Sequence, residues 1–444
     1  MKKLDLGKDS IIKLFLSYAV PSVISSIIFS IYIVIDGIFV GRAVGSQGLA
    51  AINIAMPIFS MALALGIMVS IGGNTVTSIE LGSGQKEKAR KSFSLGFYSL
   101  ISVSVIIGLI IFIFRTKIAI MLGASSELMK PVIEYLVILC ISVPIFTGGS
   151  YLAAGIRTMG KPSFSMFCTV LGSVVNIILD YIFVIMWGLG VAGAAIASGI
   201  AFFITFIVAF IEIQSEKSVL KLCICELDLR KIGRFFYNGS SEALAEVAFA
   251  FTTFIFNIVL MRRMGEVGVS AFSIIQYIAS LVVAVFLGIA NGITPIISYN
   301  YGAKSGKRIK EIIALSVKVM MFLGVICTAF LFFGGEGLIN LFVTGEAKLL
   351  ETTVFACKIY SLSFLVSGIN ILSSSYFTAL ENAKTSAIIS FLRGIAFIAI
   401  GITILPAILG DTGVWATMIF SEVATLIIAI MLMKKSYSNL EMLS

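Results

Sequence analysis

Long apolar runs, separated by short polar segments, dominate this chain. Runs such as Leu100–Phe114 and Ala201–Ile211 contain no charged residue, and the mean hydropathy of +1.08 over 444 residues is far above that of a soluble domain. A membrane-spanning helix needs about 20 predominantly apolar residues. We therefore predict an all-α membrane protein with about twelve spans. The predicted spans are 14–40, 51–80, 92–114, 131–156, 162–187, 190–212, 234–262, 272–300, 309–334, 351–379, 384–408 and 411–433.

Charge placement indicates how the chain is oriented in the membrane. The formal net charge is +9. If the N-terminus is cytoplasmic, Lys and Arg on the inner side outnumber those on the outer side roughly three to one, as the positive-inside rule requires. The opening stretch MKKLDLGKDSIIKLF lacks the apolar core and cleavage site of a signal peptide, so we expect it to remain as a tail. We expect both termini in the cytoplasm, and we attribute the basic excess to topology and not to nucleic-acid binding.

The chain repeats itself at an offset of 220 residues. Glycines carry most of the repeat: Gly45 and Gly265, Gly48 and Gly268, Gly72 and Gly292, Gly190 and Gly410, Gly193 and Gly413. Each half holds six predicted spans, and an even number returns the chain to its starting side, so the halves should be parallel repeats. We expect an N-terminal lobe (1–212), a cytoplasmic connector (213–233), a C-terminal lobe (234–433) and a cytoplasmic tail (434–444).

Two carboxylates lie inside predicted spans, where a charge costs several kcal/mol. Asp36 is roughly 8 Å and Asp180 roughly 10 Å below the outer ends of their spans, counted along the helix axis. Asn176 precedes Asp180 by one turn, and Ser198 lies at a similar depth in the next span. These are hard oxygen ligands in a chain without histidine. We predict a site for Na⁺ or a shared proton in the N-terminal lobe. The alternative is that each acid is only hydrogen-bonded to neighbouring helices.

Pro21 lies in the same span as Asp36. A proline inside a helix removes a backbone hydrogen bond, so Pro21 is either a hinge that repositions Asp36 or a static kink. The repeat aligns Asp36 with Phe256, so the acid pair has no direct copy in the second lobe. We therefore expect the two lobes to be unequal, with the ion site in the N-terminal lobe.

The second lobe offers polar residues of its own. Glu246, Asn257 and Gln276 are candidates for a substrate cleft between the lobes, where Glu246 could counter a cationic substrate. Glu80 and Glu422 are weaker candidates, because each could pair with a Lys or Arg. No nucleophile, catalytic triad, phosphate-binding loop or metal-ligand cluster stands out in the sequence. We expect a protein that is not an enzyme and has no cofactor beyond a coupling ion.

Several segments resemble the multidrug and toxic compound extrusion (MATE) family, above all its bacterial multidrug exporters. They are Pro21 together with IVIDGIFVGRAVG (Ile33–Gly45), NIILDYIF (Asn176–Phe183), GVAGAAIAS (Gly190–Ser198) and PIISYNYGA (Pro295–Ala303). The resemblance covers nearly the whole chain. It implies the MATE fold, with two pseudo-symmetric six-helix lobes, in the cell membrane of a bacterium.

The resemblance also implies roles for particular residues. The family's N-lobe cation site corresponds to Asp36, Asn176, Asp180 and Ser198, the last of which is often Thr in relatives. Pro21 matches a proline whose bending has been linked to transport, and Glu246 matches an acidic position of this branch. Branches with a Na⁺ site in the second lobe carry an acid inside span 10, and Glu351–Ala379 has none in its interior.

The function implied by the resemblance is export of small, cationic, amphipathic compounds in exchange for Na⁺ or H⁺. We expect a monomer, surrounded by membrane lipids, that works by alternating access. The main alternative is a lipid or lipid-linked oligosaccharide flippase of the same superfamily. Such a flippase would line its cleft with basic residues, whereas the spans here offer little beyond Lys318, Lys358 and Arg393. A passive channel and a duplicated scaffold without transport are further alternatives.

Overall fold

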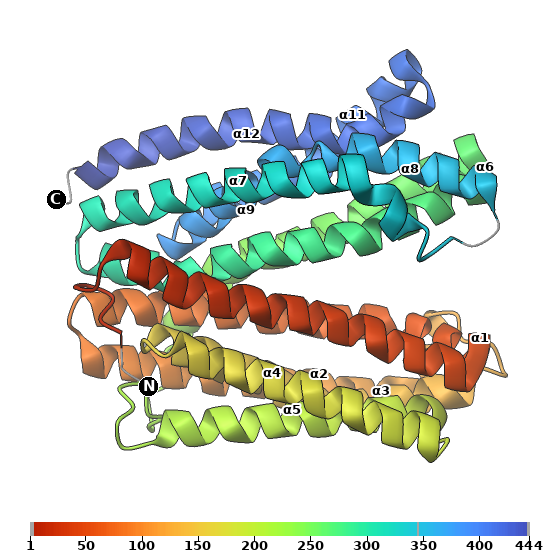
Figure 1. The fold of residues 1–444 in the computed structure, drawn as a ribbon. Coiled ribbons are helices and arrows are strands. Elements are labelled where there is room, and N and C mark those ends of the chain that lie inside the picture. Colours follow the sequence, from red (N-terminus) through yellow and green to blue (C-terminus); the bar gives the residue numbers. More distant parts are fainter. Residues whose placement is uncertain (1–3, 344–345, 442–444) are drawn as a thin grey trace. The chain divides into compact units, whose positions relative to one another are not determined.

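The structure is a computed structural model that describes residues 4–343 and 346–441. These residues form helices, and no strand occurs among them (Figure 1). The α-helices are α1 (Ile11–Gly82), α2 (Lys86–Met121), α3 (Met129–Thr158), α4 (Pro162–Asp180), α5 (Gly190–Gln214), α6 (Leu229–Gly302), α7 (Gly306–Ile339), α8 (Ala347–Ser361), α9 (Phe364–Ala379), α10 (Ala383–Phe391), α11 (Phe397–Leu409) and α12 (Asp411–Glu441). Two short π-helices are also present. The first, η1 (Tyr181–Met186), continues from the end of α4, and the second, η2 (Leu392–Ala396), connects α10 to α11.

The predicted architecture of twelve spans is confirmed. Ten helices of the described chain are long and apolar enough to cross a membrane. Helices α8 and α9 meet at a 51° bend and together form an eleventh span. Helix α6 is two helices that meet at Gly265, where the backbone is not helical, and this division gives the twelfth. The helices extend past the predicted spans, as α2 does, because hydropathy marks only the apolar part of each helix.

Two predicted outer loops are wrong. Helical structure replaces the loops expected between the first and second spans and between the seventh and eighth. Each connection is a kink at a single residue, Gly45 (φ 72°, ψ −161°) or Gly265 (φ 66°, ψ −152°). This combination of angles is essentially restricted to glycine. One glycine therefore turns the chain where the polar sequence suggested a longer connection.

The backbone repeats along with the sequence. Gly45 and Gly265 have nearly the same angles, and Gly190 and Gly410 share a φ of 60–61°. Equivalent backbone hydrogen bonds close the turns after Gly82 and Gly302. The backbone N–H of Gln85 donates to the Glu80 carbonyl, and that of Ser305 donates to the Asn300 carbonyl, both at 2.9 Å. The 220-residue repeat thus fixes local geometry at corresponding points of the two halves.

The contacts of the chain divide it into two compact units. Unit 1 comprises the residues through Asp9 and Val20–Gly239, and unit 2 comprises Ser10–Ala19 and the chain from Ser240 onward. These boundaries differ from the expected lobes in two places. The connector and the first turns of α6 group with unit 1, and the first turns of α1 group with unit 2. Both switch points, after Ala19 and after Gly239, obey the 220-residue offset.

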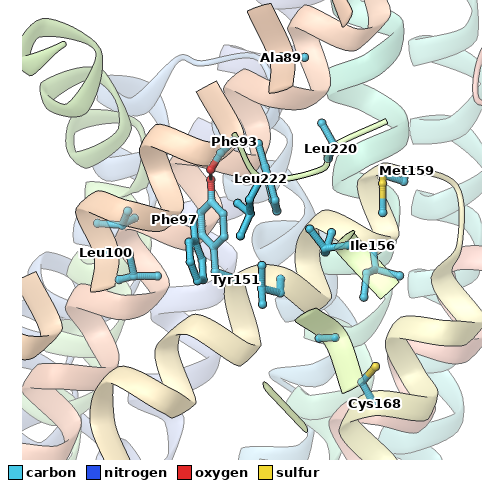
Figure 2. Packing of buried hydrophobic residues seen from close by; sticks show 14 residues of the cluster. Ala89, Phe93, Phe97, Leu100, Tyr151, Ile156, Met159, Cys168, Leu220 and Leu222 are labelled. Carbon is cyan, nitrogen blue, oxygen red and sulfur yellow. Dashed lines mark hydrogen bonds between the residues drawn. The ribbon is translucent and has the colours of Figure 1, made fainter. Parts of the chain in front are cut away.

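Unit 1 packs α2, α3 and α5 around buried aromatic residues. Figure 2 shows Tyr151 reaching from α3 to α2, where its hydroxyl donates to the Phe93 carbonyl at 3.0 Å. A Cβ at Gly96 would lie 2.2 Å from that hydroxyl, so the contact requires glycine. Leu220 and Leu222 of the connector are buried in the same cluster. The connector is therefore part of the hydrophobic core of unit 1.

The start of α6 is fixed to unit 1 by backbone contact and by charge. A Cβ on Gly72 would lie 2.0 Å from the Phe235 carbonyl oxygen, and one on Gly239 would lie 1.8 Å from that of Met68. Lys231 forms an ion pair with the buried Glu80 at 3.1 Å. Such close approach leaves no room for side chains, which explains glycine at both positions.

Unit 2 packs α7, α9 and α12 side by side, as Figure 1 shows. Trp415 of α12 is fully buried. Buried hydroxyl groups connect α6 to the helices beside it: Ser241 is 3.1 Å from Thr378, which is 2.8 Å from Ser386. These bonds satisfy hydroxyl groups that would otherwise be costly to bury among apolar helices.

Candidate functional site

Two carboxyl groups meet inside unit 1. Asp180 is the last residue of α4, immediately before η1, and it is fully buried. Its side chain lies within hydrogen-bonding reach of that of Asp36 on α1. A carboxylate can only accept hydrogen bonds, so the two groups can bond to each other only when they share a proton. We call these two residues the acid pair.

Asn176 and Ser198 complete the group that depth along the spans predicted. The Asn176 amide satisfies both neighbours when its nitrogen faces Asp180, to which it then donates at 2.8 Å. In this orientation its oxygen accepts from the Ser198 hydroxyl at 3.1 Å and from the Ser198 backbone N–H at 3.2 Å. The structure therefore places all four predicted residues in contact as one group. Their role in binding a cation remains a prediction.

The acid pair has unused bonding capacity. One carboxylate oxygen of Asp36 and one of Asp180 are buried without a hydrogen-bond partner among the described residues. An unpaired polar atom in a low-dielectric interior is costly, and two adjacent carboxylates cannot both remain charged there unaided. A proton or a monovalent cation would relieve both penalties. The oxygen atoms of this group are the ligands that a hard cation such as Na⁺ prefers.

Two tyrosines beside the acid pair were missed by the sequence reasoning. Tyr32 is hydrogen-bonded to Ser198, and both Tyr32 and Tyr135 interact electrostatically with the two acids. Tyr32 precedes Asp36 by one helical turn, a spacing that could have identified it. Tyr135 comes from α3, and nothing in the sequence connects it with Asp36.

Aromatic rings pack near this group. Phe29 lies 5.5 Å from Tyr32 and 6.5 Å from Phe146, measured between ring centroids. Phe146 also packs on Phe202 at 4.6 Å. These rings place apolar surface beside the acid pair, where electrostatic interactions are stronger than in bulk water.

Pro21 lies inside α1 without breaking it. The backbone remains helical there, in contrast to Gly45. The Ser25 hydroxyl donates to the Pro21 carbonyl at 2.9 Å. Pro21 comes directly after Val20, the first residue of α1 that groups with unit 1. Its proposed role as a hinge remains a prediction.

The three substrate-cleft candidates all belong to unit 2, and no described hydrogen bond joins them. Glu246 is exposed on α6. Asn257 has a buried amide oxygen without a partner in the described chain. Gln276 donates to Thr253 at 3.4 Å and accepts from Tyr360 at 3.3 Å.

The two weaker acidic candidates are both paired, which is the alternative that the sequence left open. Glu80 accepts from Ser92 as well as pairing with Lys231. Glu422 pairs with Arg393 at 2.8 Å. Neither glutamate lies beside a second carboxylate as the two residues of the acid pair do. One oxygen of Glu80 accepts no hydrogen bond in the described chain, but it forms ion pairs with Lys88 and Lys231.

Comparison with known proteins decides the family. The MatE family model matches residues 21–182 and 243–403, which is well over half of the chain. The chain belongs to the MATE family. The matched residues include Pro21, Asp36, Asn176 and Asp180, so the family segments contain the acid pair.

Relatives of this MATE protein include the multidrug export protein MepA of Staphylococcus aureus. The two are 26% identical over 418 residues, 94% of this chain and 92% of MepA. An outward-facing multidrug resistance MATE transporter of the MOP superfamily has the same fold, with a TM-score of 0.92, 22% identity and 99% of both chains covered. A MOP superfamily transporter from Pyrococcus furiosus, described as having a binding pocket of reverse polarity, gives 0.90 at 22% identity, covering 99% of this chain and 100% of that one. These likenesses show that the chain has the fold of these transporters.

Proposed function

We propose that this MATE protein is a secondary active antiporter that exports small, cationic, amphipathic compounds in exchange for Na⁺ or H⁺. The observation that carries the proposal is the acid pair, with one buried and unpaired oxygen on each carboxyl group. MepA, a relative along nearly the whole chain, is named a multidrug export protein, which supports the substrate class. The protein acts as a monomer in a bacterial cell membrane, with both termini in the cytoplasm.

The coupling ion acts on the acid pair through electrostatics. When a proton or Na⁺ is bound, one positive charge offsets the repulsion between two buried carboxylates. When the ion leaves, a conformation that keeps both carboxylates away from water becomes unfavourable. The ion therefore binds the two conformations with different affinity, and this difference is what allows its gradient to drive alternating access.

Organic cations are suited to the remaining chemistry of the chain. Glu246 supplies an exposed negative charge, with Asn257 and Gln276 as neutral polar groups. The sequence also contains 35 Phe and 17 Met, whose rings and flexible thioethers accommodate varied apolar cations. Differently shaped substrates can bind such a surface without a fixed set of hydrogen bonds.

The flippase alternative has few free basic groups inside the spans. A phosphate-bearing lipid requires Arg or Lys in its binding site. Arg393 is paired with Glu422, and the Lys358 ammonium lies 6.0 Å from the Phe332 ring. Of the three basic residues inside the spans, only Lys318 has no described ion pair or aromatic partner, which argues against a phosphate site.

Transport by purified protein in liposomes tests the proposal, with ethidium as the probe and an imposed Na⁺ or H⁺ gradient as the driving force. We expect Asp36→Asn and Asp180→Asn to abolish gradient-driven transport. Glu87→Gln is the matched control, because it makes the same carboxyl-to-amide change on a side chain that is 80% exposed. Full transport by both aspartate variants would disprove the assignment of the site.

Applying each gradient separately then identifies the coupling ion. Transport driven by a Na⁺ gradient at equal pH on both sides indicates Na⁺. Transport driven by a pH gradient in Na⁺-free buffer indicates H⁺. If neither gradient drives ethidium transport but labelled lipid changes leaflet, the protein is a flippase.

A further inference from the structure

Unit 2 contains a buried carboxylate whose bonding is complete. Glu422 of α12 is only 2% exposed. Its Oε1 accepts from Arg393 Nε and lies 2.8 Å from Arg393 Nη2, and its Oε2 accepts from Asn370 Nδ2 at 2.7 Å. Three elements, α12, η2 and α9, thus converge on one carboxylate. Both oxygens are occupied by donors at distances typical of charge-assisted hydrogen bonds.

The backbone that carries Arg393 is held in place. Arg393 lies in η2, where the π-helical turn displaces backbone carbonyls from their α-helical partners. Two of these carbonyls accept from hydroxyl groups instead: that of Arg393 from Ser421, and that of Gly394 from Thr252 at 2.9 Å. A Cβ on Gly394 would lie 2.5 Å from the Ala248 Cβ, so α6 packs directly on this turn. The guanidinium therefore projects from a fixed point.

Unit 1 and unit 2 differ here by one positive charge. The acid pair brings together two carboxyl groups and leaves two oxygens without partners. Around Glu422, an amide donor and a guanidinium fill the corresponding places. In both units an amide side chain, Asn176 or Asn370, donates to the acid. The two sites differ in their source of positive charge. In unit 2 this charge is the guanidinium of Arg393, which is part of the chain.

We propose that Glu422 and Asn370 form a cation site that is permanently filled by the guanidinium of Arg393. This site consequently binds no exchangeable ion, and the coupling ion acts at the acid pair of unit 1. The statement about the coupling ion rests on the proposed function, whereas the existence of the Glu422–Asn370 site does not. If the site exists, removing the Arg393 side chain should leave a vacancy that selects a planar cation of the guanidinium class.

Thermal unfolding of the purified protein tests this vacancy. Trp415 is buried in the same helix as Glu422, so its fluorescence reports on unit 2 once Trp187, the other tryptophan of the chain, is replaced by Phe in all variants. In NaCl we expect Arg393→Ala to lower the melting temperature by on the order of 10 °C, because it leaves a buried charge unpaired. Guanidinium at tens of millimolar should restore at least half of this loss. Choline at the same ionic strength should not restore it.

Four further proteins serve as controls. Guanidinium should not raise the melting temperature of the wild type. It should also not stabilise Arg263→Ala, which removes an arginine from the exposed pair with Asp411 (38% and 51% exposed). The double variant Arg393→Ala, Glu422→Gln has no carboxylate to neutralise, so it should be more stable than Arg393→Ala and show no rescue. Arg393→Lys keeps a tethered charge and should retain most of the wild-type stability.

Stabilisation specific to guanidinium in Arg393→Ala alone supports the proposal. Equal stabilisation of the double variant, or none in any variant, would overturn it. If Arg393→Ala does not fold, the yield of the double variant decides: recovery of folded protein supports a vacant charge site, and failure of both variants contradicts it. These readouts do not require transport, so they remain informative even if the exporter assignment is wrong.

Discussion

The two units of this protein neutralise buried carboxylates in different ways. In unit 1, Asp36 faces Asp180, and each keeps one oxygen without a partner. In unit 2, Glu422 faces Arg393, and both of its oxygens are bonded. An incompletely neutralised site can respond to ion concentration, whereas a self-neutralised site cannot. Sequence duplication thus produced two similar scaffolds, of which one has the chemistry of an exchangeable cation site.

Giving unit 1 its own tethered cation should have the largest effect. Asp36→Lys places an ammonium group beside Asp180, in imitation of Arg393 beside Glu422. We expect this variant to fold but to lose gradient-driven transport entirely. The tethered ammonium group is present in both conformations, so it cannot shift the equilibrium between them. Ethidium transport and the Na⁺ or pH dependence of melting measure the effect. Ion-dependent transport that survives in this variant would contradict the comparison.

Breaking the pair in unit 2 should destabilise the protein without changing which ion drives it. Glu422→Gln leaves the guanidinium of Arg393, which is 29% exposed, beside an amide and should cost about 1–3 kcal/mol of stability. The ion that drives ethidium transport should be the same as in the wild type. Chemical or thermal denaturation measures the first effect, with Glu87→Gln as the control for an exposed carboxylate. A change of coupling ion would show that unit 2 takes part in coupling.

Substitutions at Gly45 and Gly265 test whether the two kinks contribute equally to stability, as their similar geometry suggests. Each has a backbone conformation that costs about 1–3 kcal/mol for other residues. Gly45→Ala and Gly265→Ala should therefore destabilise the protein by similar amounts. Gly233→Ala and Gly337→Ala provide helical controls where an added Cβ meets no atom within 4 Å, and we expect no loss of stability from them. Clearly unequal costs at the two kinks would limit the repeat to geometry.

The smallest effect is expected from the phenol beside the acid pair. Tyr32→Phe removes a hydrogen bond to Ser198, worth about 0.5–1.5 kcal/mol. It should raise the ion concentration needed for half-maximal transport by roughly two- to tenfold. Tyr98→Phe changes an exposed tyrosine of the same unit and should have no effect. If the two variants behave alike, Tyr32 does not support the acid pair.

The sequence predicted those features that depend on local pattern. Apolar runs marked the spans, glycine spacing marked the repeat, and helix depth brought Asp36, Asn176, Asp180 and Ser198 to one layer. The span and depth signals are contained within single helices, and the repeat is read directly from residue spacing along the chain. The structure placed the four residues in contact, because the helices that carry them are neighbours in unit 1.

Other features depend on contacts between helices and could not be predicted. Tyr135 joins the acid pair from α3, and the partner of Glu422 was ambiguous because any nearby basic residue satisfied the pattern. The connector looked like a polar linker, yet Leu220 and Leu222 bury it in unit 1. The loops at Gly45 and Gly265 were misjudged because hydropathy does not report backbone angles.

The number of exchangeable cations bound by the purified protein tests the central claim most directly. Proton release measured in weakly buffered solution, together with equilibrium binding of radioactive Na⁺, counts them for the wild type, the double variant Asp36→Asn, Asp180→Asn, and Glu422→Gln. We predict one exchangeable cation in the wild type and in Glu422→Gln, and none in the double variant. An unchanged count in the double variant, or the loss of a cation in Glu422→Gln, would contradict the assignment of the exchangeable site to unit 1.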